Sequence, residues 1–423
     1  MTLPVDTPET RADTRWLLTL CGAQVCIMLV FMNYSAVLPQ LKEEWGMSNT
    51  RAGTIFSAYQ LGYILSGVLL STLTDRLNTK YIFLVSALWS ACANLLFALL
   101  AHDYTSGLLL RGLTGIGMGG TYMPGLKLVA ERFPSHKRGT AVGVYVGALM
   151  LGTSLSLAIT GGLSSHFGWR WAIAACSLGV GIGIIAAFPV FRDYRHQPRP
   201  VRSGSYGSEV MRNRPALLMI GGYGAHMWEM YGMRSWVAPF FTAQLATFGM
   251  RQADATAWGS LASAAVVGIG TFATAITGTL SDRWGRTRTI ILVMLGSALL
   301  SFSFGWLYSI SIPLTILVGL AYGYLVVAES PVFSTGLTEL VASGYLGSAM
   351  GIQSLVGYSM GMISPTIFGW ALDLCRGWHP WTGIQGDWGI AFSTAGIGAL
   401  FGPLCMLLLR REPASRLMAG GRR

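Results

Sequence analysis

Long apolar runs alternate with short polar segments along almost the whole chain. A helix that crosses a bilayer needs roughly 20 mostly apolar residues, and twelve runs are long enough. No run shows the alternation over about ten residues that is typical of membrane β-barrel strands. The pattern predicts an all-α polytopic membrane protein with twelve transmembrane helices. Their expected limits are 16–38, 54–73, 81–101, 107–130, 140–165, 171–191, 216–240, 256–280, 289–309, 312–336, 347–370 and 388–409.

One polar segment is much longer than the others and divides the helices six and six. It covers 192–215 and is rich in Arg, Pro, Gly and Ser, which is typical of a solvated linker. We therefore expect an N-terminal six-helix bundle over 16–191 and a C-terminal bundle over 216–409. Residues 1–15 and 410–423 are expected to be cytoplasmic tails.

The basic residues are distributed very unevenly between the two sides of the predicted membrane. Of the 29 Lys and Arg, 21 fall in segments on the side that holds both chain ends, and five fall on the other side. Basic loops stay in the cytoplasm, so both termini are predicted to be cytoplasmic, in a cell (inner) membrane. The net charge of +11 does not favour a nucleic-acid partner, because the basic residues form no contiguous patch.

The composition supports a membrane protein and argues against enzyme chemistry. Only 11% of the residues are charged, whereas a soluble domain usually has about a quarter. The six Cys show no CxxC or Cys/His spacing, so we expect neither disulfides nor a metal site. No GxxxxGK[ST] or HExxH motif occurs. We expect no cofactor and no enzymatic activity, and we expect a monomer.

A charged block occurs twice, at matching places in the two halves. GTLSDRWGRTR at 278–288 corresponds to STLTDRLNTKY at 71–81, about 207 positions upstream. Four further pairs keep this spacing within one residue. The chain is therefore predicted to contain two six-helix repeats with the same orientation. The five pairs are Asp75 with Asp282, Pro124 with Pro331, Glu131 with Glu339, Gly139 with Gly347, and Gly143 with Gly351.

The second block resembles the loop signature of the major facilitator superfamily of secondary transporters. The matching residues are Gly278, Leu280, Asp282, Arg283, Gly285, Arg286 and Arg288. The segment RGLTGIG at 111–117 and the residues GWRW at 168–171 are similar to further patterns of that family. The resemblance implies the twelve-helix fold, and it implies that the two blocks, including Asp75 and Arg76, gate the transport cycle.

The first block departs from the family pattern. It has Ser71 and Asn78 where Gly is expected and Thr79 where a basic residue is expected. We therefore predict that Asp282→Asn impairs transport more than Asp75→Asn. The fifth helix lacks the Gly-Pro pair of drug antiporters, and helices two and eight lack the Arg of nitrate transporters, which makes both subfamilies less favoured.

Charges inside predicted spans are expensive and are the first functional candidates. His226 and Glu229 lie three residues apart on one helix face, so this pair could couple protons to transport or pin the helix to a neighbour. Arg234 could bind an anion or extend to the outer interface. Arg111 could bind an anion or anchor its bundle. Glu329 could carry a proton or accept a structural hydrogen bond.

Several polar and aromatic side chains in the spans could line a substrate path or simply pack. The positions are Asn33, Tyr34, Tyr59, Gln60, Tyr63, Tyr145 and Gln353. Together with the embedded charges, they favour a secondary transporter that uses alternating access. We expect its partners to be a small-molecule substrate, protons and the lipid bilayer.

The sequence favours a small organic or inorganic anion as the substrate, moved with protons. The observations are two embedded Arg, one carboxylate–imidazole pair and the missing Gly-Pro. Proton-coupled export of apolar or cationic compounds is the main alternative. A sensor or assembly protein on the same scaffold, without transport, is a further one.

Overall fold

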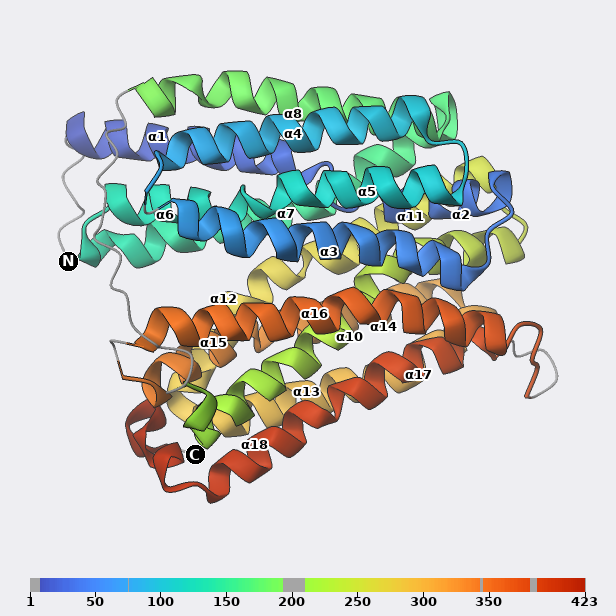
Figure 1. Ribbon diagram of the computed structural model, residues 1–423. Coiled ribbons are helices and arrows are strands. Elements are labelled where there is room, and N and C mark those ends of the chain that lie inside the picture. The colour runs from blue at the N-terminus through green and yellow to red at the C-terminus, as the bar shows by residue number, and fades with distance from the viewer. Residues whose placement is uncertain (1–7, 75, 193–209, 343–344, 381–385, 423) are drawn as a thin grey trace.

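The computed structural model describes residues 8–74, 76–192, 210–342, 345–380 and 386–422, which are almost entirely helical. Figure 1 shows two groups of helices, one from each half of the chain, lying side by side. Helices satisfy their own backbone hydrogen bonds, which a water-free bilayer requires. Asp75 and most of the predicted linker lie outside the described residues.

The helices of the first half follow the predicted spans, with two of the spans divided. The bounds are α1 (Pro8–Met28), α2 (Asn33–Glu44), α3 (Asn49–Leu73), α4 (Thr79–Leu100), α5 (Tyr104–Gly119), α6 (Tyr122–Arg132), α7 (Ser135–Phe167) and α8 (Trp169–Arg192). The first helix begins at Pro8, inside the segment that the sequence assigned to a polar tail.

The second half has the same plan and divides three of its spans. The bounds are α10 (Arg214–Thr247), α11 (Gln252–Gly268), α12 (Gly270–Trp284), α13 (Arg286–Phe304), η1 (Gly305–Ser309), α14 (Ile312–Ala328), α15 (Ser330–Leu340), α16 (Leu346–Leu374), α17 (Asp387–Ala399), α18 (Phe401–Arg411) and η3 (Pro413–Gly421).

Ten helical segments among the described residues are long and apolar enough to cross a membrane. The two other predicted spans are helical as well. One is divided into α5 and α6, and the other is α10, whose polar and glycine residues lower its mean hydropathy. The predicted twelve-helix architecture is thus confirmed.

Two of the divisions lie beside embedded charges. Residues 29–32 separate α1 from α2, and Glu329 itself separates α14 from α15. Such breaks free backbone groups, and inside a membrane they are tolerated where protein or a polar path satisfies them. The sequence predicted continuous helices at both places.

The two halves converge towards one end of the molecule. In Figure 1, α3 and α16 lie close together on the right and separate towards the left, where α1 begins and the chain ends. We call the left side the terminal end and the right side the opposite end. Near the opposite end, a Cβ atom on Gly53 would lie 2.3 Å from the Pro365 oxygen. Farther along, a Cβ on Gly147 would lie 4.0 Å from Thr271. Towards the terminal end, the glycines that have no described neighbour within 4 Å of that position include Gly139, Gly143, Gly347 and Gly351.

Candidate functional site

The Arg111 guanidinium is completely buried in the first half of the chain. It extends from α5, and its Nη1 donates to the Oδ1 atoms of Asn33 at 3.0 Å and Asn94 at 3.1 Å. Asn33 begins α2, while Asn94 lies in the middle of α4. The two amide oxygens place partial negative charge next to a cation that cannot lose its proton in a protein.

Backbone carbonyls and aromatic rings complete the surroundings of Arg111. Val30 and Phe31, in the break between α1 and α2, accept from its two Nη atoms at 3.4 Å each. Three ring faces lie within cation–π distance, at 4.7 to 5.9 Å from the guanidinium carbon: Tyr34, Tyr59 and Phe97. No carboxylate among the described residues pairs with Arg111. Neutral dipoles therefore surround this charge, and their hydrogen bonds connect three helices.

A second buried group lies in the other half and is acidic. His226 on α10 and Glu329, at the break between α14 and α15, form a pair with Nδ1 and Oε1 2.7 Å apart. Glu229 accepts instead from the Ser297 hydroxyl at 2.8 Å. All three titratable side chains are fully buried. The expected pairing of His226 with Glu229 is therefore corrected, because helical spacing indicates a shared face but does not choose a partner on another helix.

This acidic group retains polar atoms without partners and adjoins a hydroxyl chain. His226 Nε2 and Glu329 Oε2 are buried, and neither has a hydrogen-bond partner among the described residues. Close by, the Tyr322 hydroxyl donates to Ser301 Oγ at 2.9 Å, and Ser301 donates to the Phe392 carbonyl at 2.8 Å. Groups that can gain or lose a proton are thus concentrated where three helices of the second half meet.

Arg234 is the other buried arginine, and its surroundings differ from those of Arg111. It lies on α10 and is 3% exposed, so it does not extend to the outer interface as the sequence suggested. Its Nη2 contacts the Met150 sulfur of α7 at 3.6 Å. A thioether is only a weak acceptor. Arg234 therefore faces the other half of the molecule without a strong acceptor among the described residues.

The remaining predicted lining residues divide into packing positions and interface positions. Tyr34 donates to the Ala52 carbonyl at 2.9 Å, and Tyr145 donates to Gln24 at 2.7 Å, so both hydroxyls are satisfied inside the first half. By contrast, Tyr63 of α3 lies with its hydroxyl 3.4 Å from that of Tyr358 on α16.

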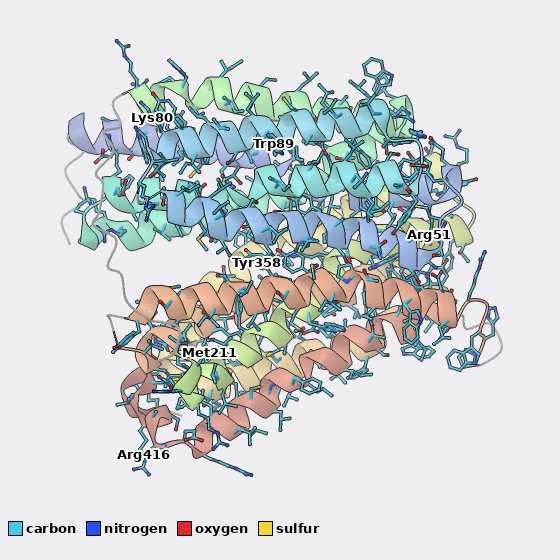
Figure 2. All side chains as sticks on the ribbon, viewed as in Figure 1. Arg51, Lys80, Trp89, Met211, Tyr358 and Arg416 are labelled. Atoms are coloured by element: carbon cyan, nitrogen blue, oxygen red, sulfur yellow. The ribbon has the colours of Figure 1, made fainter. Side chains whose placement is uncertain are left out.

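Tyr63 belongs to the first half and Tyr358 to the second, and Figure 2 shows Tyr358 between α3 and α16. Their contact therefore joins the two halves. The two glutamine candidates are buried as well: Gln60 is 1% exposed, and Gln353 is 3% exposed with an unpartnered Nε2 atom.

The loop motif of the second half forms a compact ion-pair cluster at the terminal end. Gly285 ends α12 with a φ of +91°, a conformation that glycine adopts without steric cost. Arg286 follows and donates to Asp282 at 2.5 Å and to Glu339 of α15 at 2.9 Å. Asp282 is thus paired with one of the arginines of its own block. Three other motif residues are exposed: Arg76, Arg283 and Arg288.

The C-terminal segment packs onto this cluster. The Ala419 amide donates to Glu339 Oε2 at 3.2 Å, and Arg422 donates to the Asp282 carbonyl at 2.7 Å. Met418 is 1% exposed. The segment after Arg411 is therefore docked against α12 and α15, where the sequence suggested only a tail.

Two important polar residues were not among the sequence candidates. Asn94 lies in a predicted span, 81–101, that carries no charge, so embedded charges do not point to it, although a lone amide in an apolar span is itself a signal. Asp373 ends α16 and accepts from the backbone amides of Asn49 at 2.9 Å and Thr50 at 2.7 Å. It also accepts from the Thr50 hydroxyl at 2.7 Å, so it joins the halves at the opposite end.

Comparison with known proteins gives consistent relatives along most of the chain. The model of the Major Facilitator Superfamily matches residues 20–365. A "probable 4-methylmuconolactone transporter" of Cupriavidus pinatubonensis is 25% identical over 78% of this chain and 76% of its own length. A "probable sulfoacetate transporter" of Cupriavidus necator is 23% identical over 81% of this chain and 83% of its own.

A similar solved structure is that of a bacterial homologue of the human lysosomal transporter Spinster, described as inward-facing and unoccupied. It superposes with a TM-score of 0.73 at 16% identity, covering 97% of this chain and 98% of that one. At this identity the likeness concerns the fold.

Proposed function

Because the chain belongs to the Major Facilitator Superfamily, we propose that it is a secondary transporter that moves a small organic or inorganic anion together with protons. The two six-helix units, 16–191 and 216–409, open alternately towards the two sides of the membrane. With both termini in the cytoplasm, as the basic loops predict, the terminal end faces inwards. The described conformation then has its outer end closed.

The separation of buried positive from buried negative groups carries this proposal. Neither Arg111 nor Arg234 forms an ion pair with an acid among the described residues. Glu229 and Glu329 lie in the second half, and neither pairs with an arginine among the described residues. Charges buried in a membrane protein are costly unless a partner arrives. An anion can partner Arg234, and a proton can partner the carboxylates.

The acidic group supports coupling to protons. A carboxylate bonded to an imidazole stabilises the charged ring, whereas a second carboxylate nearby favours protonation of one of the acids. His226 and Glu329 come from different helices, and Glu329 stands at a helix break. A change of protonation there alters a contact between α10 and the α14–α15 break. Movement of these helices would follow from that change.

The relatives support an anionic substrate. Sulfoacetate, which is named for one of them, is a small organic anion. Among the described residues no acid pairs with Arg234, so the charge at this position attracts an anion rather than a cation. Uptake of sulfoacetate and 4-methylmuconolactone, followed by a panel of organic acids, tests the class of substrate in vesicles that contain the purified protein.

The coupling is tested with Glu329→Gln in the same vesicles. We expect this variant to lose accumulation driven by a pH gradient, because the neutral amide cannot exchange a proton. It should retain counterflow, in which labelled and unlabelled substrate exchange without net proton movement. Glu229→Gln is expected to have the same effect to a smaller extent.

The matched control is Glu43→Gln, which makes the same chemical change on an exposed residue. It should leave both assays unchanged. Full pH-driven accumulation by Glu329→Gln and Glu229→Gln would show that this group does not couple protons. Absence of anion transport by the wild-type protein would overturn the proposed function itself.

A further inference from the structure

Two fully enclosed arginines differ in what surrounds them, and the difference identifies a binding residue. Arg111 has amide oxygens, backbone carbonyls and ring faces around it. Among the described residues, Arg234 has a single polar contact, to the sulfur of Met150 at 3.6 Å. A guanidinium carries five N–H donors in a planar fork. Oxygen acceptors take both Nη atoms of Arg111, and only its Nε is left without a partner among the described residues. Arg234 has no oxygen acceptor among those residues, so most of its donors are available to a ligand.

Arg234 lies where the two halves of the chain meet. Ser35 of α2 donates to the Ser235 carbonyl and lies 3.5 Å from the Arg234 carbonyl, so α2 packs directly on this turn of α10. Met150 belongs to α7, which is also in the first half. A ligand bound at this guanidinium would therefore contact both halves, which a transported solute must do in the course of alternating access.

Aromatic rings from both halves surround the turn that precedes Arg234. Tyr231 lies three residues earlier on α10, and its ring centroid is 6.3 Å from that of Tyr358. Phe31 and Phe56 of the first half lie 6.4 and 6.5 Å from the Tyr231 ring. Tyr358 in turn lies 4.9 Å from Tyr63, and both rings are partly exposed. The flat faces of these rings, with few polar groups between them, thus adjoin the single positive charge of Arg234.

We propose that Arg234 binds the carboxylate of a small organic acid with a planar, unsaturated skeleton, and that the tyrosine rings hold this skeleton. The inference rests on the proposed transport function and deepens it. A carboxylate matches the guanidinium fork with two parallel hydrogen bonds. Unsaturated rings pack on aromatic faces in offset or edge-on arrangements.

A polyhydroxy acid fits these surroundings less well. Each buried hydroxyl needs its own hydrogen-bond partner, and a hydroxyl left without one weakens binding severely. Beside Arg234 the structure offers a thioether and ring faces, and the nearby groups that could serve a hydroxyl are few: the tyrosine hydroxyls and the amide of Gln60. The surroundings therefore favour aromatic acids or unsaturated lactone acids over sugar acids, which carry several hydroxyls each.

Equilibrium binding to the purified full-length protein tests the inference with three probes: benzoate, its neutral amide benzamide, and gluconate. We expect benzoate to bind at least about tenfold more tightly than either of the others, because only benzoate has both a carboxylate and a flat ring. Isothermal titration calorimetry measures all three. Failure of benzoate to bind the wild-type protein, or equal binding of benzamide, would overturn the class of ligand.

Variants then assign the residue. Arg234→Gln should weaken benzoate binding by about tenfold or more, and Arg234→Lys should recover part of it, because lysine keeps the charge and loses the fork. Arg251→Gln is the matched control at an exposed arginine and should bind like the wild type. The melting temperature without ligand shows whether each variant is folded. Wild-type affinity in a folded Arg234→Gln protein would refute the role of Arg234.

The outcomes separate this inference from the proposed function. If the wild-type protein transports an organic acid but Arg234→Gln binds that acid unchanged, the binding site is wrong and the transport function stands. If benzoate binding depends on Arg234 but no anion crosses the membrane, the site stands and the transport function is wrong.

Discussion

The two ends of the molecule use their charged side chains in opposite ways. At the opposite end, Asp373 of the second half accepts three hydrogen bonds from Asn49 and Thr50 of the first half. At the terminal end, Arg286 pairs with Asp282 and Glu339, which both belong to its own half. Polar contacts therefore join the halves at one end, whereas at the other end they remain within one half.

This difference indicates which contacts must break during transport. The first backbone amides of a helix have no hydrogen-bond partner within the helix, and a carboxylate that accepts from them stabilises the helix end. Asp373 supplies such a cap to α3 from the other half, so opening this end exposes the amides again. The cluster around Arg286 can persist through the same movement. The described conformation is thus stabilised mainly at its closed end.

The close helix contact at the closed end gives the largest expected effect. Gly53→Ala places a Cβ 2.3 Å from the Pro365 oxygen. Neither atom can move aside locally, because the Cβ is fixed to the backbone of α3 and the oxygen belongs to the backbone of α16. Overpacking of this kind costs about 3 kcal/mol, which shifts the balance away from closure by about a hundredfold. Distances between spin labels at 167 and 252, measured by pulsed electron resonance in a background without the native cysteines, report on this end.

The control for that substitution is Gly139→Ala. It adds the same methyl group to a helix, at a position with no neighbour within 4 Å. We expect an unchanged distance distribution and a slightly more stable helix. A distribution in Gly53→Ala that matches the wild type would show that the halves are not held this closely together.

The cap supplied by Asp373 gives the next largest effect. Asp373→Asn keeps the shape of the side chain but removes its negative charge, and it should weaken closure by about 1–2 kcal/mol, or roughly tenfold. The same pair of spin labels should show a larger population of long distances. Asp254→Asn, on an acid that pairs with Arg251 in its own half, is the matched control. A population that changes equally in both variants would contradict an inter-half cap.

The sequence predicted features that depend on local pattern and failed for those that depend on packing. Hydrophobic length, for example, predicted the spans. The partner of His226 is Glu329, 103 residues away, and no spacing along one helix can identify it. The break before Asn33 was hidden because its residues are as apolar as the helix around them.

Sequence repeats gave a further kind of information, which the structure extends. The repeat matches Glu339 with Glu131, but it does not indicate that Glu339 pairs with Arg286. That ion pair depends on α13 and α15 lying together in the fold. Asp373 carried no such signal. It lies at a helix end where acids are common, and its partners are backbone amides that look alike in every sequence.

The smallest effect is expected at the terminal end, where the two copies of the charged block can be compared. Asp282→Asn removes one of the two acids that pair with Arg286, but Asp282 is largely exposed and Glu339 remains, so the loss should be below about 1 kcal/mol. At the position that corresponds to Arg286, the first copy has Thr79, so Asp75 lacks the equivalent arginine in its own block. Asp75→Asn should therefore reduce the transport rate in vesicles less than Asp282→Asn does.

Thr79→Arg is the informative control, because it restores the missing cation and should make transport more sensitive to loss of Asp75. Equal rates in the two aspartate variants would mean that the arginine, rather than the acid, is the residue on which the block depends.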